Sequence, residues 1–330
     1  MRICVFGAGA IGGNFAARLA AAGNEVSVVV RGPHLDAIKA NGLTLIAGTK
    51  KIVASVRASD RPAELGRQDA VISTLKATGL AALAEGVGPL LGPDTPVVFA
   101  QNGIPWWYGH GLAAGRPPAP DLSRLDPGGA LARSVGLGRT LGGVITSPNH
   151  VVAPGVVVHE QPERNTLWVG EIDDRQSARV AALRGALVAA GIGSPATTDI
   201  RYDIWHKLMA NLTGSTLCLV LGQAVAIQKT PIVNQLARRA HAEALSVAAA
   251  HGIVLDDHPD TRYGPARVYT NHRPSILQDY DLGRPMEIEA IVRAPVAFAK
   301  SVGVPTPTLE AIEAFAVSMA ASKGLYDLAE

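Results

Sequence analysis

The 330-residue sequence has little of several residue types, and each shortage argues against a class of protein. Its 30 Lys and Arg nearly balance its 28 Asp and Glu, so it lacks the basic surplus with which nucleic-acid-binding proteins neutralise phosphates. Charged residues are 18% and apolar residues 48% of the chain, which excludes intrinsic disorder. We therefore expect a folded protein with no nucleic-acid partner.

Cysteines and long apolar runs are also scarce. The two cysteines, Cys4 and Cys218, lie far apart in apolar segments and are expected to be buried, reduced thiols. A long stretch without charge, residues 208–227, contains Asn, Thr, Ser and Gln, which indicates a buried helix and not a membrane span. The N-terminus has no signal-peptide pattern. These features predict a cytoplasmic protein with no membrane partner.

Several catalytic signatures are absent, namely HExxH, GxSxG and CxxC. The acidic run at residues 256–260, which includes His258, suggests a metal site at first sight. Its spacing matches no standard metal site, and capping residues in a loop between helices are the better interpretation. We expect no metal.

The first 30 residues hold the most informative pattern. An apolar run at residues 3–6 is followed by GAGAIG at residues 7–12, by helical spacing at residues 14–22 and by a valine-rich second strand at residues 25–30. This order of strand, glycine-rich turn, helix and strand is typical of a βαβ unit that binds a dinucleotide. The alternative is a purely structural glycine turn.

Each glycine of this motif has a physical role in such a site. Gly7 permits the tight turn, Gly9 lets the backbone approach a pyrophosphate, and Gly12 allows close packing of helix on strand. The helix start, with Ala10 and Ile11, offers N–H donors and the positive end of the helix dipole to phosphates.

The end of the second strand indicates which dinucleotide is bound. NAD-preferring sites usually carry Asp or Glu there, whereas this chain has Arg31. A guanidinium fits a 2′-phosphate well, which favours NADP(H). The alternative is that Arg31 is merely solvated.

The remaining pattern predicts two domains. Strands are expected to continue the sheet at residues 43–46, 70–73 and 96–100, with a helix at 80–91, which implies a parallel, doubly wound α/β sheet of Rossmann type. Residues 104–140, with Trp106 and Trp107, are read as an inserted surface excursion. Further expected elements are β-rich segments at 141–147, 151–159 and 166–171, and a helix at 176–190.

From residue 199 onward the pattern is helical. The division is therefore a Rossmann-like NADP(H)-binding domain at residues 1–197, which includes the excursion, and an all-α substrate and catalytic domain at residues 198–330. The main helices are expected at residues 204–227, 232–251, 287–302 and 309–321.

Two charged residues of this second part have open interpretations. Lys207 and Asn211 are four residues apart and share one otherwise apolar helix face, where a lysine either reaches solvent or is functional. Glu287 lies in the first turn of a predicted helix, where an acidic residue ordinarily complements the helix dipole.

An ordered set of motifs resembles the ketopantoate reductase (2-dehydropantoate 2-reductase) family over nearly the whole chain. Each motif is modest alone, but the set in this order is highly specific. The motifs are GAGAIG at residues 7–12, STLK at 73–76, QNG at 101–103, WHKL at 205–208 with Asn211, SILQD at 275–279 and GRPMEI at 283–288.

The resemblance implies NADPH-dependent reduction of a 2-oxo acid to a 2-hydroxy acid by hydride transfer. It implies Lys207 as the general acid at the substrate's C2 oxygen, and Glu287 as the group that holds the lysine or a substrate hydroxyl. It places Asn102 between nicotinamide and substrate. It also assigns Asn211 and Ser275 to substrate, and Lys76 and Arg31 to cofactor.

The sequence departs from the family pattern around the substrate. Ser215 stands where a second asparagine is frequent, His272 where asparagine is common, and Ile276 where the family has Met. Val292 and Arg293 replace a frequent Asn-Gly pair. The catalytic motifs are thus complete, whereas the substrate-binding residues are altered.

Three hypotheses follow. The first is ketopantoate reduction, the second is reduction of a different 2-oxo acid on the same scaffold, and the third is a non-catalytic NADP(H)-binding sensor. An active site in the cleft between the domains and a homodimer are further expectations.

Overall fold

The computed structural model describes residues 1–328 and divides the chain into two compact units. The first contains Met1–Gln101 and Asp126–Ile200, and the second contains Asn102–Leu125 and Arg201–Glu330. The later boundary lies three residues beyond the predicted one. The segment Asn102–Leu125, however, belongs to the second unit, whereas the sequence analysis placed it in the first.

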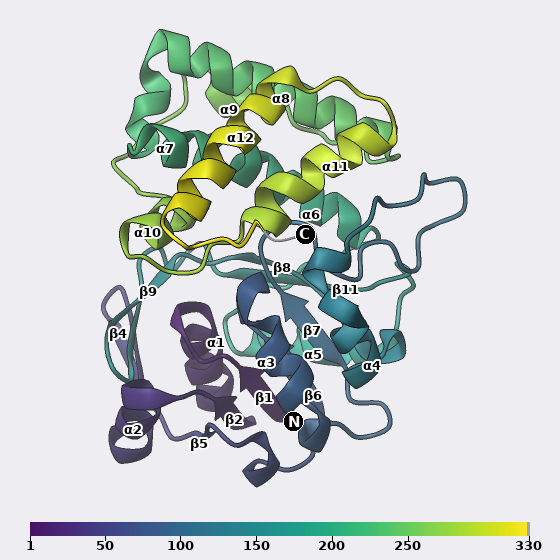
Figure 1. Ribbon diagram of the computed structural model, residues 1–330. Coiled ribbons are helices and arrows are strands. Elements are labelled where there is room, and N and C mark those ends of the chain that lie inside the picture. The colour runs from purple at the N-terminus through teal and green to yellow at the C-terminus, as the bar shows by residue number, and fades with distance from the viewer. Residues whose placement is uncertain (329–330) are drawn as a thin grey trace. The chain divides into compact units, whose positions relative to one another are not determined.

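The first unit is built on a seven-stranded sheet in the order β11-β8-β7-β6-β1-β2-β5 (Figure 1). All neighbouring strands are parallel except β11, which runs antiparallel to β8. The predicted doubly wound α/β fold is therefore confirmed. The strands are β1 (Arg2–Phe6), β2 (Glu25–Val29), β5 (Arg57–Ser59), β6 (Ala70–Ser73), β7 (Val97–Ala100), β8 (Thr140–Thr146) and β11 (Thr166–Glu171).

Continuous apolar runs explain the central strands of this sheet. Every residue of β6 and β7 is buried, and only the first residue of β1 is exposed. A strand covered on both faces needs apolar side chains at every position, not at alternate ones.

A second, four-stranded sheet in the first unit has the order β4-β3-β10-β9. Its strands are β3 (Leu43–Ala47), β4 (Lys50–Ala54), β9 (Asn149–Ala153) and β10 (Val156–His159). The prediction that residues 43–46 continue the main sheet is therefore wrong. Burial alternates along β3, as expected for a sheet with only one covered face.

Helix α1 (Ala10–Ala21) packs against strands of both sheets and carries much of the core, including the fully buried Phe15 and Leu19. The other helices of this unit are α2 (Gly32–Asn41), α3 (Leu80–Gly86), α4 (Ala130–Ser134) and α5 (Ala178–Ala189).

The second unit is helical, as predicted. Helices α8, α11 and α12 pack side by side (Figure 1). The α-helices are α6 (Ile200–Met209), α7 (Thr216–Leu221), α8 (Pro231–Ala250), α9 (Pro259–Tyr263), α10 (Ser275–Asp281), α11 (Ala294–Ser301) and α12 (Pro307–Ser322). Two π-helical segments, Ala210–Ser215 and Glu289–Arg293, adjoin α7 and α11.

The tryptophan-rich segment is not a surface excursion over its first residues, so this prediction is wrong. Trp106, Trp107 and Tyr108 are at most 5% exposed. Tyr108 accepts a hydrogen bond from the Trp205 indole at 2.7 Å, and its ring meets Phe298 edge-on at 4.9 Å. Burying large aromatic rings stabilises a fold strongly, which explains why this stretch is internal.

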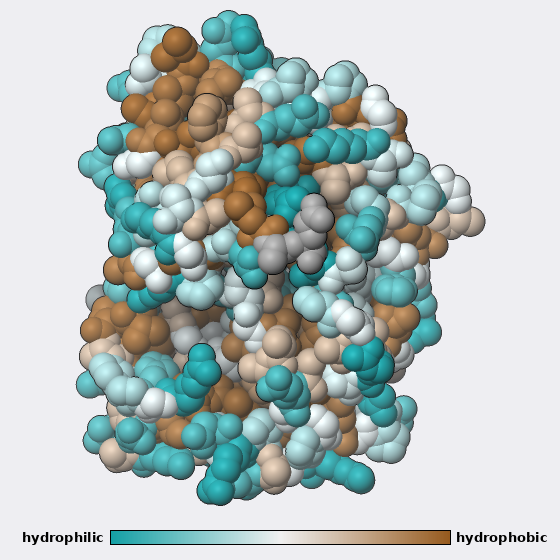
Figure 2. All heavy atoms as spheres, in the orientation of Figure 1, coloured by the Kyte–Doolittle hydropathy of each residue, from teal (hydrophilic) through white to brown (hydrophobic). Residues whose placement is uncertain are grey.

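No helix within residues 1–328 is long and apolar enough to cross a membrane. The helical unit nevertheless exposes large apolar side chains, among them Leu221, Ile232 and Phe315. Figure 2 shows apolar atoms gathered over part of this unit. The predicted homodimer stays a prediction.

Candidate active site

The glycine-rich turn connects β1 to α1. Gly7 has φ of +99°, a conformation that L side chains rarely adopt, and its N–H donates to the Val29 carbonyl at 3.0 Å. A Cβ on Gly9 would meet no atom within 4 Å, so the turn leaves open space at this position. The first residues of α1 direct N–H groups beyond the helix end, where no helical carbonyl accepts them.

Gly12 is where the helix approaches the strand most closely. A Cβ there would lie 2.4 Å from the Gly7 carbonyl oxygen and 2.9 Å from a Val5 methyl. The packing role predicted for Gly12 is therefore confirmed. Gly13, which the sequence analysis passed over, does the same toward the second sheet, because its Cβ would lie 2.7 Å from Val157 of β10.

The strand order reverses direction between β1 and β6, which is the position where α/β sheets bind ligands. The loop after β6 closes on the glycine turn, since the Thr74 hydroxyl donates to the Gly7 carbonyl at 2.7 Å. Lys76 lies in this loop and is partly buried. The structure thus brings the predicted glycines and the Lys76 loop together within the first unit.

Arg31 occupies the residue before α2 and is exposed. It follows β2, whose last residue, Val29, is bonded to Gly7 and Ala8 of the glycine turn. Its guanidinium is therefore available to a ligand at this end of the sheet.

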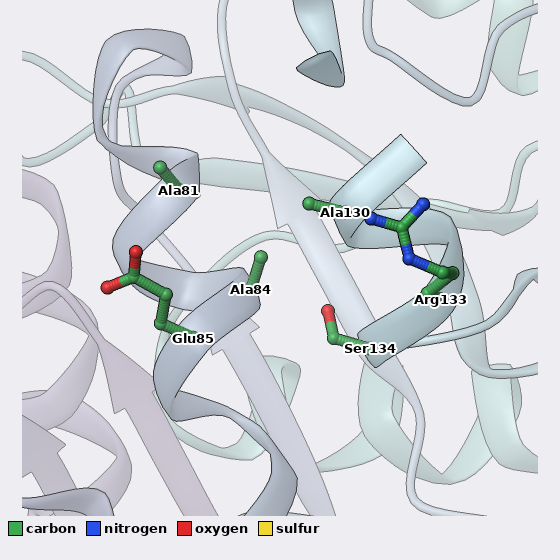
Figure 3. A pocket seen from close by; sticks show the side chains of 6 residues that line it. All are labelled: Ala81, Ala84, Glu85, Ala130, Arg133 and Ser134. Atoms are coloured by element: carbon green, nitrogen blue, oxygen red, sulfur yellow. The ribbon is translucent and has the colours of Figure 1, made fainter. Parts of the chain in front are cut away.

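A pocket of about 330 Å³ lies elsewhere in the first unit, between α3 and α4 (Figure 3). It contains none of the predicted site residues. Its lining residues are Ala81, Ala84, Glu85, Ala130, Arg133 and Ser134. Half of these residues are alanines, and because the pocket holds none of the predicted site residues, we do not assign the active site to it.

In the second unit, Lys207, Asn211 and Ser215 are partly exposed polar residues at four-residue intervals. They follow one another along α6 and the π-helical segment Ala210–Ser215. Asp174 caps the start of α6, with its carboxylate accepting from the Ile200 N–H at 2.9 Å.

Side-chain hydroxyls explain the local widening of this helix. Thr213 donates to the Met209 carbonyl at 2.6 Å, and Thr216 donates to the Asn211 carbonyl at 2.9 Å. Hydroxyls that bond backbone carbonyls compete with the regular helical pattern. Single-turn π-helical segments are frequent at functional sites because they shift the direction of following side chains.

Glu287 is buried and lies two residues before the start of the second π-helical segment. The Asn102 amide donates to its carboxylate at 3.2 Å. Asn102 was predicted for both substrate and cofactor, and the structure places it in the same unit as Glu287. The sequence offered no direct signal for this hydrogen bond, because 185 residues separate the two.

Lys207 and Glu287 influence each other electrostatically. Burial lowers the pKa of Lys207 from its ordinary value, and the Glu287 carboxylate partly opposes this, so the pKa is about 8. An ammonium that titrates near neutrality is well matched to proton transfer. Burial and a charged partner together mark a functional lysine more strongly than helix spacing alone.

Ser275 is exposed at the first residue of α10, a helix that packs against α7 and the segment Ala210–Ser215. The neighbouring His272 is also exposed. The structure therefore keeps Ser275 on an element that adjoins the Asn211 segment.

The acidic run at residues 256–260 acts as predicted, by capping. His258 precedes α9, and its imidazole accepts from the Asp260 N–H at 3.1 Å. Asp257 instead lies against the buried His241 imidazole at 3.2 Å and pairs with Arg262.

The protein combines two kinds of unit. One is a Rossmann-type α/β unit with a glycine-rich turn, and the other is a helical unit in which a glutamate raises the pKa of a lysine. Models of the ketopantoate reductase family match both parts of the chain. The model described as "Ketopantoate reductase PanE/ApbA" matches residues 3–113, and its C-terminal counterpart matches residues 199–317. The chain belongs to the ketopantoate reductase family.

Individual relatives agree with this assignment. A protein of Mesorhizobium japonicum named 2-dehydropantoate 2-reductase is 40% identical, over 99% of this chain and 100% of its own. The crystal structure of a putative ketopantoate reductase from Ralstonia solanacearum has a TM-score of 0.87 and 34% identity, covering 98% and 99% of the two chains. A D-mandelate dehydrogenase solved with NADH and anilino(oxo)acetate shares the fold, with a TM-score of 0.81, 24% identity and coverage of 99% and 100%.

Proposed function

We propose that the protein reduces 2-dehydropantoate to pantoate with NADPH, with Lys207 as the general acid. Family membership supports the reaction type, and the 40% identical relative carries the name of this enzyme. The observation that carries the proposal is the buried Glu287 carboxylate, which accepts a hydrogen bond from Asn102 at 3.2 Å and opposes the fall in the Lys207 pKa that burial causes.

The residues of the first unit suit a dinucleotide. The space beside Gly9 would admit a pyrophosphate, and the N–H groups of Ala10 and Ile11 would donate to it. Arg31 would bind a 2′-phosphate, and Lys76 would lie along the cofactor. When bound, the reduced nicotinamide supplies two electrons and one hydrogen to the carbonyl carbon of the substrate.

Lys207 acts on the oxygen of the same carbonyl. Negative charge develops on this C2 oxygen as the carbonyl is reduced, and the Lys207 Nζ stabilises the charge by a hydrogen bond. The ammonium then gives its proton to the oxygen, which yields the 2-hydroxy acid and a neutral lysine. Solvent returns the proton.

Glu287 and Asn102 support the action of Lys207. The Glu287 carboxylate favours the charged form of Lys207, which is the form that a general acid requires. Asn102 fixes that carboxylate through its 3.2 Å hydrogen bond. Asn211 and Ser275 would bind polar groups of the substrate.

A second candidate function keeps the reaction and changes the substrate to another 2-oxo acid. Ser215 favours it, because it lies on the same partly exposed stripe as Lys207 and Asn211, with a hydroxyl in place of a frequent carboxamide. A hydroxyl reaches less far and makes fewer hydrogen bonds than a carboxamide.

Steady-state assays with a panel of 2-oxo acids test both candidates. The panel contains ketopantoate, branched aliphatic acids and phenylglyoxylate, each with NADPH and with NADH. We expect ketopantoate to have the highest kcat/KM. A kcat/KM for another acid far above that for ketopantoate would favour the second candidate, whereas NADPH binding without turnover of any acid would indicate a sensor.

A further inference from the structure

The Glu289 carboxylate is the centre of a charged cluster two residues beyond Glu287. The Arg124 guanidinium donates to it at 3.0 Å, and the Tyr326 hydroxyl donates to it as well. Arg293 lies 3.6 Å from the same carboxylate and donates to the Tyr326 oxygen at 2.9 Å. The Glu289 side chain is 21% exposed, so these contacts are partly shielded from water.

This cluster joins three separate stretches of the second unit. Arg124 comes from the segment Asn102–Leu125, Glu289 and Arg293 from the π-helical segment, and Tyr326 from the chain after α12. Arg124 also donates to the Asp327 carbonyl at 2.7 Å. Ion pairs in a network hold their members better than isolated surface pairs do.

A second set of contacts joins the segment Asn102–Leu125 to the π-helical segment close to Glu287. The Ile104 N–H donates to the Ala290 carbonyl at 2.8 Å. Gly103 has φ of +78°, and a Cβ on it would lie 2.3 Å from the Ala290 carbonyl oxygen. The chain at Asn102 therefore packs directly on the turn that follows Glu287, beside the Asn102–Glu287 hydrogen bond.

The backbone hydrogen bonding of this turn departs from that of a regular α-helix. Pro295 has no N–H to donate back along the helix, so regular hydrogen bonding is interrupted at the end of the π-helical segment. Arg293, at a position where the family frequently has glycine, contributes two of the contacts that brace the turn: one to Glu289 and one to Glu313 at 3.5 Å.

We propose that Glu289, held by Arg124, Arg293 and Tyr326, is a positioning residue that fixes Glu287 against Asn102. Glu289 touches no reacting atom in this role. It acts by holding the start of its helix to the segment Asn102–Leu125, and so keeps the Glu287 carboxylate where it supports the Lys207 ammonium. The inference rests on the proposed function of Lys207 and Glu287.

The test compares three variants with the wild-type protein, using NADPH and the best substrate of the 2-oxo acid panel. Glu289→Ala removes the acceptor, Glu289→Gln keeps an oxygen that can accept from Arg124, and Tyr326→Phe removes one hydroxyl. We expect Glu289→Ala to lower kcat on the order of tenfold to a hundredfold, the cost of a small displacement at a catalytic group. Glu289→Gln should recover part of this loss.

Two further readouts separate positioning from general loss of structure. The KM for NADPH should change less than about twofold, since the cluster lies within the second unit. The alkaline limb of the kcat/KM profile should move to lower pH, because a displaced Glu287 no longer raises the pKa of Lys207. If Glu289→Ala does not fold, Tyr326→Phe should show the same shifts at smaller size.

Arg238→Ala is the matched control. Arg238 is as exposed as Arg124, at 32%, and pairs with Asp260 elsewhere in the same unit. Its kcat and pH profile should match those of the wild type. If the wild type is active and both Glu289→Ala and Tyr326→Phe keep its kcat and pH profile, the positioning role of Glu289 is wrong, while the proposed function stands. A wild type that reduces no 2-oxo acid would overturn the proposed function and the inference with it.

Discussion

At the scale of single residues, the proposed role of Lys207 predicts how the rates of reduction and oxidation depend on pH. Folding lowers its pKa to about 8, so the ammonium predominates below that pH and the neutral amine above it. Reduction needs the ammonium, whereas oxidation of the 2-hydroxy acid needs the neutral amine as base. We expect kcat/KM for reduction to fall as pH rises through about 8, and kcat/KM for oxidation to rise.

The same profile tests Glu287. Its carboxylate raises the pKa of Lys207, so Glu287→Gln should move the limb for reduction to lower pH, in addition to lowering kcat. The profiles are measured as kcat/KM between about pH 6 and pH 10, where the two protonation states exchange. A rate that stays flat through this range in the wild type, or a limb unmoved in Glu287→Gln, contradicts the assignment.

The predicted preference for NADPH over NADH depends on Arg31. A guanidinium pairs with a 2′-phosphate, and a carboxylate at the same place repels it and accepts from a ribose hydroxyl. Arg31→Asp should therefore raise the KM for NADPH far more than that for NADH.

The control for this charge reversal is Arg67→Asp. Arg67 is also exposed, but it precedes β6 and so lies toward the amino ends of the parallel strands. It should leave both KM values nearly unchanged. Equal effects of Arg31→Asp on the two cofactors would show that Arg31 does not select between them.

At the scale of elements, substitutions of the two motif glycines should have different effects. Replacing Gly12 should lower the stability, and replacing Gly9 should lower the affinity for NADPH. Gly12→Ala places a methyl 2.4 Å from the Gly7 oxygen, and overpacking of this kind costs ~1–3 kcal/mol of stability. Gly9→Ala meets no protein atom, so its stability should change little while its affinity for NADPH falls.

Thermal unfolding and NADPH titration measure these two effects. Gly185→Ala is the control, since Gly185 lies in the interior of α5 with no atom near its Cβ position. It should raise the stability by roughly 0.5–1 kcal/mol and leave NADPH affinity unchanged. An unaltered affinity in Gly9→Ala would remove the turn from the cofactor site.

The sequence was most informative where one local rule decides the structure. The βαβ unit followed from apolar runs and glycine spacing, and the capping by His258 followed from an acidic loop. The sheet that contains β3 did not, because an alternating strand of five residues does not say which partner it pairs with. The burial of Trp107 was missed because its neighbour Arg201, whose guanidinium lies 5.5 Å from the centre of the indole ring, is distant in sequence.

In the candidate site, too, local features could be predicted from the sequence, whereas contacts between distant residues could not. Lys207 and Asn211 were recognisable as neighbours on one helix, but the partnership of Asn102 with Glu287 required the fold. The Glu289 cluster was invisible for the same reason, since its members come from three stretches of the chain. The π-helical segments were also missed, because helical periodicity does not reveal one extra residue in a turn.

At the scale of the whole molecule, the residues proposed for cofactor and for substrate lie in different units. The first unit contains the glycine turn, Lys76 and Arg31, and the second contains Lys207, Glu287, Asn102 and the residues proposed to bind substrate. Because the segment Asn102–Leu125 belongs to the second unit, Asn102 lies in the same unit as Lys207 and Glu287. Substrate preference should accordingly change with residues of the second unit and cofactor preference with those of the first.

The most direct test of the central claim is the single-turnover rate of ketopantoate reduction by Lys207→Met at pH 7, with saturating NADPH. The account predicts a loss of ~10²–10⁴ relative to wild type, the contribution of a positioned general acid, with an unchanged Kd for NADPH. His206→Ala, at the exposed neighbouring position, should retain the wild-type rate. A loss of only a few fold in Lys207→Met would contradict the account.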